Sequence, residues 1–334
     1  MTGGVYNGGW IGESNLIPET DKITLGKTDL QIPPMGIGAW SWGDRFYWGY
    51  GRDYGEKDVR AAFEACLEAG IAFFDTAEIY GQGRSERLLG QMLQSLPADQ
   101  AENIIVATKF FPYPWRLWKR NLESALKSSL NRLMRPQVEL YQIHWPYPPL
   151  SIESWATALA DVVDQGLARS VGVSNYNANQ MRRTHAVLIK RGLLLTSNQV
   201  EFSLLNRRVE KSGLLKQCQD LSITCIAYSP IAMGVLSGKY SPSHPLSGVR
   251  SVRYPPKYLS QIEPLLRLLR EIGDAHEGKT PSQVAINWVI CKGAVPIPGV
   301  KTLQQAQENL GALGWRLTDD EVNALDGATD RISP

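Results

Sequence analysis

The sequence predicts an α/β fold, and within that class a single (β/α)8 TIM barrel. Short apolar runs typical of buried strands alternate with amphipathic helical patterns, and the alternation repeats eight times. With 334 residues, of which 43% are hydrophobic, the chain is long enough to bury the core of such a barrel. The predicted strands end near Gly38, Asp75, Thr108, Gln142, Val173, Gln199, Ala227 and Ile297. Helical patterns between them include residues 56–69, 119–133, 152–165, 178–191 and 209–221.

Two segments precede the first strand of the barrel. Residues 1–22 are expected to form an N-terminal tail, and they lack the basic start and the apolar stretch of a signal or transit peptide. Residues 23–32 alternate around a Gly-Lys-Thr-Asp turn, which is typical of a β-hairpin. We therefore expect residues 23–334 to form one barrel domain that begins with this hairpin.

The interval between the predicted seventh and eighth strands is about twice as long as the others. Its excess, residues 232–280, contains a loop rich in Pro, Ser and Gly, followed by an amphipathic helix over residues 258–276. Long connections in a compact domain are commonly functional. This pattern predicts an insertion at the catalytic face of the barrel.

Composition excludes several classes of function. The formal net charge is +2 with no block of like charge, so neither nucleic acid nor an anionic membrane is the indicated partner. No apolar run approaches the length of a membrane span. The four cysteines show no CxxC spacing and the histidines outside the motifs lack partners, so we expect no metal site. We predict a cytoplasmic protein in a reducing compartment.

Polar residues follow three of the predicted strands at the point where each strand ends. Asp75 and Tyr80 follow an apolar run ending at Phe74, Lys109 follows Ile104–Ala107, and His144 follows Val138–Tyr141. Strand ends of a parallel barrel share one face, which is where catalysis takes place in such folds. A tyrosine works as an acid near neutral pH if a neighbouring cation lowers its pKa from about 10, and Lys109 would supply that cation.

These motifs, FDTAEIYG, ATKF and QIHWP, resemble those of the aldo-keto reductases. The resemblance extends from about Ile23 to Leu325, and is strongest to members from cyanobacteria and plant chloroplasts. It implies that Asp75, Tyr80, Lys109 and His144 form the catalytic tetrad of that family. It also implies that the hairpin plugs the bottom of the barrel, that the cofactor is NADPH/NADP+, and that the protein is a monomer or a small homo-oligomer.

The chain contains no complete G-x-G-x-x-G fingerprint, so a nicotinamide cofactor must be held in another way. The stretch from Val295 to Thr302 predicts a last strand followed by a helix N-terminus, a common phosphate site in barrels. Its candidate cofactor-binding residues are Pro298, Gly299, Lys301 and Thr302. Three other strand ends supply a hydroxyl, two amides and an aromatic face suited to a nicotinamide carboxamide and ring. These residues are Ser174, Asn175, Gln199 and Tyr228.

The resemblance adds two further groups of cofactor contacts. Along the pyrophosphate it implies Ser229, Ile231, Gly234, Leu236 and Lys239. At the adenine end it implies Gln305, Glu308 and Asn309, although many members carry an arginine where Gln305 stands. Aromatic residues follow the first, third and fourth strands, which suits an apolar or aromatic substrate pocket. The pocket candidates are Trp40, Trp42, Phe111 and Trp145.

The predicted function is NADPH-dependent reduction of small-molecule aldehydes or ketones. Tyr80 would protonate the carbonyl oxygen, Lys109 paired with Asp75 would lower the pKa of Tyr80, and His144 would orient the carbonyl. Two alternatives remain open at this point. Lys109 could be the nucleophile of a Schiff-base aldolase, or the protein could bind NADPH as a redox sensor or regulatory subunit with little turnover.

Overall fold

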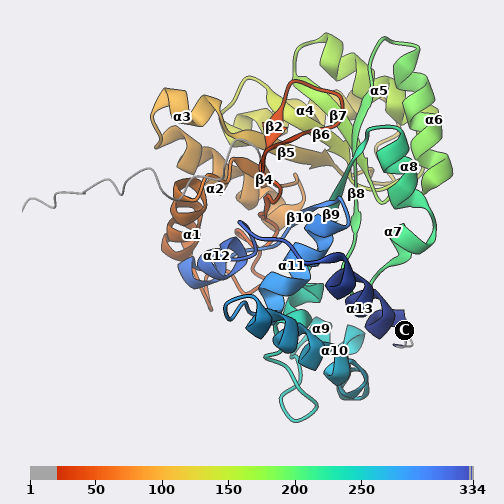
Figure 1. Ribbon diagram of the computed structural model, residues 1–334. Helices are drawn as coiled ribbons and strands as arrows, with labels where there is room; N and C mark the ends of the chain where they lie inside the picture. Colours follow the sequence, from red (N-terminus) through yellow and green to blue (C-terminus); the bar gives the residue numbers. More distant parts are fainter. Residues whose placement is uncertain (1–20, 331, 333–334) are drawn as a thin grey trace, which may run out of the picture.

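The computed structural model describes residues 21–330 and residue 332, and within them eight parallel strands form one nearly closed barrel (Figure 1). The barrel strands are β3 (Ile37–Gly38), β4 (Phe73–Asp75), β5 (Ile105–Phe110), β6 (Val138–Ile143), β7 (Ala168–Ser174), β8 (Leu195–Glu201), β9 (Thr224–Tyr228) and β10 (Val295–Ile297). Each strand pairs with the next in chain order. The predicted (β/α)8 barrel is therefore confirmed.

The first and last strands meet through glycines. A parallel bridge joins Gly38 to Gly299, and the Gly36 amide donates to the Pro296 carbonyl at 3.0 Å. A Cβ added at Gly38 would lie 2.9 Å from the carbonyl oxygen of Ile297, so only glycine allows this approach. The closure brings the loop after β10 beside the loop after β3.

The predicted N-terminal hairpin is present, as β1 (Ile23–Thr24) paired antiparallel with β2 (Gln31–Ile32). Its buried side chains Leu25, Leu30 and Ile32 pack in one cluster with residues from inside the barrel, Phe73 and Val295 among them. Both of these begin their strands, so the hairpin covers the N-terminal end of the barrel. The hairpin does not cover the opposite end of the barrel, at the strand C-termini, where the predicted catalytic residues lie.

Helices surround the barrel (Figure 1). They are α1 (Glu56–Glu68), α2 (Arg84–Gln94), α3 (Ala98–Glu102), α4 (Arg120–Leu133), α5 (Ile152–Asp164), α6 (Ala178–Ile189), α7 (Arg208–Lys211), α8 (Leu214–Asp220), α9 (Val249–Arg253), α10 (Pro256–Ala275), α11 (Pro281–Cys291), α12 (Leu303–Leu310) and α13 (Asp319–Asp330). The helix predicted over residues 209–221 is wrong in one respect, because it is split into α7 and α8. Gly213 lies between them with φ of 77°, which a continuous helix cannot contain.

Residues 232–280 contain the 3₁₀ turn η4 (Ala232–Ser237), then α9 and α10. Two contacts join this segment to the catalytic end of the barrel. Arg253 forms an ion pair with Glu201 at the end of β8, and the Tyr47 hydroxyl lies 3.2 Å from the Met233 sulfur. Treating residues 23–334 as one domain with an insertion at 232–280 stays a prediction. Residues 1–20 of the predicted tail lie outside the described part of the chain.

Candidate active site

A buried ion pair lies at the C-terminal ends of β4 and β5. The Lys109 ammonium is fully buried, and its Nζ donates to Asp75 Oδ2 at 2.5 Å and to the Thr76 carbonyl at 2.8 Å. The same Nζ also donates to the Tyr80 hydroxyl, at 3.4 Å. Since an ammonium has three N–H donors, all three directions around Nζ are used.

The Asp75 carboxylate is held by two amides as well as by Lys109. Its Oδ1 accepts from Gln199 Nε2 at 2.7 Å and from Gln142 Nε2 at 3.3 Å. The role of Gln142 was not predicted, although an amide in the fully buried strand β6 is a signal that such a partner exists. Gln199, predicted to bind the cofactor carboxamide, has its amide nitrogen engaged by Asp75.

Tyr80 begins the 3₁₀ turn η3 (Tyr80–Gly83) that follows β4. Gly81 has φ of 53°, and a Cβ there would lie 2.6 Å from the Gly43 carbonyl, so glycine sets the path that places Tyr80. Burial and the negative charge of Asp75 raise the pKa of Tyr80 well above 10. The expectation that Lys109 lowers this pKa is not met in the structure, where burial and then the charge of Asp75 raise it and Lys109 is itself paired with Asp75.

His144 follows β6 and completes the group. Its backbone amide donates to the Phe110 carbonyl at 2.8 Å, and its ring meets the Tyr80 ring edge-on at a centroid distance of 5.6 Å. Burial, and then the charge of Lys109, hold the pKa of His144 well below its usual range, so the imidazole is neutral at neutral pH. Its Nδ1 is buried and has no hydrogen-bond partner among the described residues.

The hydroxyl and amide predicted after β7 lie next to this group. Asn175 Nδ2 donates to the His144 carbonyl at 3.1 Å, and Asn175 Oδ1 accepts from the Tyr228 hydroxyl at 2.9 Å. Ser174 Oγ donates to the Gln199 carbonyl at 2.9 Å. Asn175 has φ of 62°, a left-handed conformation that asparagine tolerates better than most residues. The ends of β7, β8 and β9 thus place Ser174, Asn175, Gln199 and Tyr228 together.

Aromatic side chains surround Tyr80 and His144. The Trp40 ring lies 6.1 Å from the Tyr80 ring, and Phe111 lies 5.8 Å from the His144 ring, both measured between centroids. Trp145 stacks on Tyr147 at 5.3 Å, and Tyr147 in turn contacts Phe111. These ring contacts link Trp40, Phe111 and Trp145 to Tyr80 and His144.

Trp42, the fourth aromatic predicted for the pocket, lies elsewhere. It is fully buried, its Nε1 donates to the Val300 carbonyl at 2.9 Å, and its ring packs on Phe63 and Phe74. Its position is in the layer between the barrel and α1. The structure therefore corrects the expectation that Trp42 lines the substrate pocket.

Lys301 follows β10 and lies against aromatic rings. Its Nζ is 4.6 Å from the centroid of the Trp48 ring and 5.0 Å from that of Tyr54, and it donates to the Trp48 carbonyl at 3.3 Å. Partial burial, and then the positive charges of Arg250 and Lys239, lower the pKa of Lys301 to about 8. An anion placed beside Lys301 would therefore stabilise its charged ammonium form.

The predicted adenine-end residues around Lys301 make hydrogen bonds within the protein. Thr302 caps α12 as predicted, accepting from the Gln305 amide at 3.4 Å, and Gln305 Oε1 accepts from the Lys301 amide at 2.9 Å. Glu308 is engaged by the Thr280 hydroxyl, and Asn309 is buried with Nδ2 3.4 Å from the Gly299 carbonyl. These last two contacts hold the segment together and leave less of either side chain for a ligand.

The remaining residues predicted for the cofactor lie in two stretches of unusual backbone. Pro298 and Gly299 form the junction with β3, where the Gly38 amide donates to the Pro298 carbonyl at 3.1 Å. After β9, the chain has positive φ at positions 229, 232, 233, 234 and 238. This turn carries Ser229, Ile231, Gly234, Leu236 and Lys239, of which Leu236 is fully buried and Lys239 is exposed. A fully buried Leu236 packs in the core and offers a ligand little surface.

The chain matches known proteins over nearly its whole length. Residues 34–330 match the model of the aldo/keto reductase family. The chain belongs to this family. It is 44% identical over 317 residues to the chloroplastic pyridoxal reductase of Arabidopsis thaliana, covering 92% of this chain and 85% of that protein. It is 30% identical over 352 residues to L-glyceraldehyde 3-phosphate reductase of Escherichia coli K12, covering 96% and 99% of the two chains.

Solved structures agree with this assignment. The glycerol dehydrogenase of Gluconobacter oxydans superposes with a TM-score of 0.81 at 25% identity, over 95% of this chain and 97% of that one. Membership of the aldo/keto reductase family confirms the resemblance seen in the three motifs, and the similarity to the Arabidopsis protein is consistent with a likeness to plant-chloroplast members. It identifies the protein as an oxidoreductase of small carbonyl compounds.

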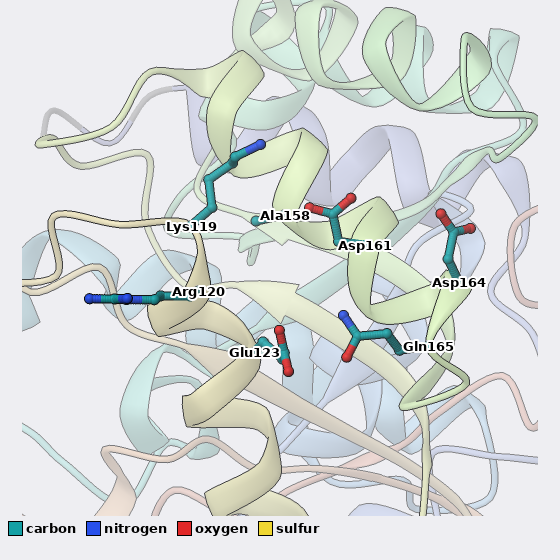
Figure 2. A pocket seen from close by; sticks show the side chains of 7 residues that line it. All are labelled: Lys119, Arg120, Glu123, Ala158, Asp161, Asp164 and Gln165. Carbon is teal, nitrogen blue, oxygen red and sulfur yellow. The ribbon is translucent and has the colours of Figure 1, made fainter.

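One hollow of this aldo/keto reductase lies apart from the tetrad. Figure 2 shows the side chains that line it, Asp161 and Asp164 among them, between α4 and α5. The hollow has a volume of about 390 Å³. Both aspartates are ion-paired with Arg191. None of the predicted site residues lines this hollow, so we assign it no part in catalysis. Within the described residues there is no helix able to cross a membrane and no cluster that could hold a metal ion.

Proposed function

We propose that the protein reduces aldehydes or ketones with NADPH, using Tyr80 as the proton donor. The observation that carries this proposal is the position of the Lys109 ammonium, 2.5 Å from the Asp75 carboxylate and 3.4 Å from the Tyr80 hydroxyl. This arrangement is suited to a hydroxyl that gives up its proton during a reaction. NADPH, when bound, supplies the hydride that reduces the carbonyl carbon.

The proton comes from the Tyr80 hydroxyl. Because the pKa of Tyr80 is raised, this hydroxyl is protonated at neutral pH and ready to donate. As negative charge develops on the substrate oxygen, Tyr80 passes its proton and becomes a phenolate beside the Lys109 ammonium. Lys109 therefore acts by stabilising the charge that forms on Tyr80 in the transition state.

His144 and the aromatic rings would position the carbonyl. A neutral imidazole has one N–H to donate, and the low pKa of His144 keeps it in that form. The unpartnered Nδ1 shows that the hydrogen-bonding capacity of this ring is not exhausted by the protein. Trp40, Phe111 and Tyr147 would hold the apolar part of the substrate, as expected for a pocket that orients a ligand with few polar groups.

The residues present suit NADPH. The amide of Asn175 and the hydroxyl of Ser174 would meet the carboxamide, and the Tyr228 ring would stack against the nicotinamide. At the other end, Lys301 has a depressed pKa and no carboxylate partner within the described residues, so a phosphate there would stabilise it. The use of NADPH as cofactor remains a prediction. The same holds for the oligomeric state, a monomer or small homo-oligomer, and for a cytoplasmic location without nucleic-acid partners.

The geometry argues against the Schiff-base aldolase. Such an enzyme needs a neutral lysine with a free lone pair that a substrate carbonyl can reach. Lys109 has no exposed surface, and three acceptors already surround its Nζ. Borohydride trapping in the presence of a carbonyl substrate should therefore leave Lys109 unmodified.

The redox-sensor alternative differs from the reductase in turnover alone. The test is a panel of carbonyl compounds with NADPH, followed by its absorbance, and including pyridoxal because the Arabidopsis relative bears that name. We expect sustained oxidation of NADPH with at least one member. Tight NADPH binding with no turnover on the whole panel would support the sensor instead.

Lys301→Ala tests the proposed phosphate contact. The lysine side chain would form a charge-assisted hydrogen bond with the 2′-phosphate, worth about 1.5–3 kcal/mol, or roughly 10- to 100-fold in affinity. With glutamine and not arginine at position 305, we expect the lower half of that range. Titration of both cofactors should show NADPH binding weakened and NADH binding almost unchanged. Equal weakening of both would mean that Lys301 supports the loop and does not read the phosphate.

The same lysine predicts a pH dependence. Below pH 8 Lys301 is mostly protonated and attracts an anion, and as the pH rises through about 8 the free protein loses that charge. Affinity for NADPH should therefore fall between pH 7 and pH 9, while affinity for NADH stays level. In Lys301→Ala the difference between the cofactors should no longer vary over this interval.

A further inference from the structure

A second ion pair lies beside the catalytic group and joins the turn that carries Tyr80 to the loop after β5. Glu78 stands between Asp75 and Tyr80 in the chain, and its two carboxylate oxygens accept from the two Nη atoms of Arg116. The distance from Nη2 to Oε2 is 2.9 Å. A fork of two such bonds fixes the orientation of both groups. The pair therefore connects the Tyr80 turn to residues 111–119, which contain neither helix nor strand.

Both members of this pair also hold the backbone of Phe111. The Phe111 amide donates to Glu78 Oε1 at 2.7 Å, and the Phe111 carbonyl accepts from Arg116 Nη1 at 2.8 Å. Strand β5 ends one residue earlier, at Phe110, so no strand pairing holds Phe111. The ion pair therefore fixes the first residue of the loop as strand pairing fixes the residues of β5.

The Glu78–Arg116 pair is largely withdrawn from water. The side chains of Glu78 and Arg116 are 9% and 19% exposed, and the guanidinium lies 4.6 Å from the centroid of the Phe110 ring. Fully exposed ion pairs fix little, because solvent and salt screen them. Partial burial reduces that screening, so this pair can hold the loop in one position.

The ring of Phe111 meets the catalytic group directly. Its centroid lies 5.8 Å from that of His144 and 6.2 Å from that of Tyr147. Displacement of the Phe111 backbone would move this ring, whereas the contact between Lys109 and Tyr80 does not depend on it. Loss of the ion pair should therefore change how a substrate is placed and leave the proton donor in position.

We propose that Glu78 and Arg116 are positioning residues that hold Phe111 against His144, and that they give the protein a preference for aromatic over small aliphatic carbonyl compounds. This inference rests on the reductase proposed above, in which Phe111 holds the apolar part of the substrate. An aromatic substrate needs a wall for its ring beyond the reacting carbonyl, and a short aliphatic aldehyde does not. The two classes of substrate should therefore respond differently when the pair is broken.

The test compares 4-nitrobenzaldehyde with propanal as substrates of Arg116→Met, which keeps an unbranched side chain and loses the fork. KM for 4-nitrobenzaldehyde should rise about tenfold, the low end of what one apolar contact in a pocket contributes, and kcat/KM for propanal should stay within about twofold. NADPH affinity and kcat for 4-nitrobenzaldehyde should also stay within about twofold, because the lost interaction positions the substrate in the ground state and the transition state alike.

Arg135→Met is the matched control, because the same pattern of contacts occurs at the other end of β5. Arg135 pairs with Glu139 at 3.2 Å and donates to the Ile104 carbonyl at 3.0 Å, and Glu139 accepts from the Val106 amide at 2.9 Å. Its exposure is similar to that of Arg116. Arg135→Met should be destabilised to a similar degree in chemical denaturation, yet keep the wild-type preference between the two aldehydes.

Glu78→Gln tests the partner of Arg116 and serves as a second variant if Arg116→Met does not fold. Glutamine keeps an oxygen for the Phe111 amide and loses the charge, so its preference should fall between those of Arg116→Met and the wild type. The double variant should match Arg116→Met, because paired groups act as one unit. Additive losses in the double variant would contradict a role for the pair.

Hydrogen exchange gives a measurement that does not depend on any substrate. Amides in residues 111–118 should exchange about tenfold faster in Arg116→Met than in the wild type, because the loop opens more often, and should be unchanged in Arg135→Met. Unchanged exchange in Arg116→Met would overturn the inference. A substrate preference that falls equally in Arg116→Met and Arg135→Met would overturn it as well.

The inference and the proposed reductase can fail separately. Benzamide, an unreactive carbonyl compound with an aromatic ring, is titrated into each variant by calorimetry. A wild type without turnover whose benzamide affinity falls in Arg116→Met, and not in Arg135→Met, would contradict the reductase and support the positioning role. An active wild type whose substrate preference is shared by Arg116→Met would contradict the positioning role and leave the reductase in place.

Discussion

Tyr80→Phe should lower kcat for carbonyl reduction by about 10²-fold or more, the usual scale for loss of a general acid. The substitution removes one hydroxyl and keeps the ring that packs against Trp40 and His144, so the fold and the pocket should survive. Steady-state kinetics and NADPH titration check the result together. We expect NADPH affinity to remain within about twofold of the wild type, because the hydroxyl acts on the substrate oxygen.

A matched control is Tyr113→Phe, which removes a hydroxyl from another tyrosine in the loops of the catalytic face. Tyr113 stacks on Trp115 at 4.5 Å and makes no contact with Lys109, so its variant should keep the wild-type rate. If Tyr80→Phe retained most of its activity, the proton would have to come from another group. A loss confined to NADPH affinity would equally count against Tyr80 as the acid.

Lys109→Met should abolish most activity and also destabilise the protein. Without the ammonium, the phenolate that forms at Tyr80 has no cation beside it, so kcat should fall at least as far as in Tyr80→Phe. Removing one partner of a buried ion pair typically costs about 3–5 kcal/mol, and Asp75 is only 1% exposed. Chemical denaturation and kinetics on the same variant measure both effects.

The double variant Lys109→Met with Asp75→Asn separates the two roles. Asparagine removes the unpaired charge and can still meet the amides of Gln142 and Gln199, so much of the lost stability should return. Activity should not return, because the cation is still missing. A double variant that regained both would show that Lys109 is needed for folding alone, and one that regained neither stability nor activity would contradict the ion-pair explanation.

Much of the site could be predicted because polar residues interrupt apolar runs at strand ends. Asp75, Lys109 and His144 each follow a stretch that is buried in the structure, and a parallel barrel brings all such ends to one face. The strand ends themselves were predicted to within about two residues, a usual error for element boundaries. An error of about two residues does not change the prediction that these side chains lie at the C-terminal face of the barrel.

Properties that depend on tertiary packing could not be predicted from the sequence. Trp40 and Trp42 stand two positions apart in the same aromatic stretch, yet one lies beside Tyr80 and the other packs under α1. The pKa of Tyr80 depends on burial, which a motif does not reveal. Arg250 and Lys301 lie over the same Trp48 ring, and the path of a long connection brings Arg250 there.

Transfer of deuterium from NADPH that carries deuterium at both hydrogen positions of the nicotinamide C4 tests the central claim most directly. The measurement is mass spectrometry of the product from a carbonyl compound that the panel shows to be turned over, with Tyr80→Phe alongside. The account predicts an alcohol with one deuterium on the former carbonyl carbon, formed at least about 10²-fold more slowly by Tyr80→Phe. Oxidation of NADPH without deuterium in an alcohol, or equal rates of labelled product from both proteins, would contradict it.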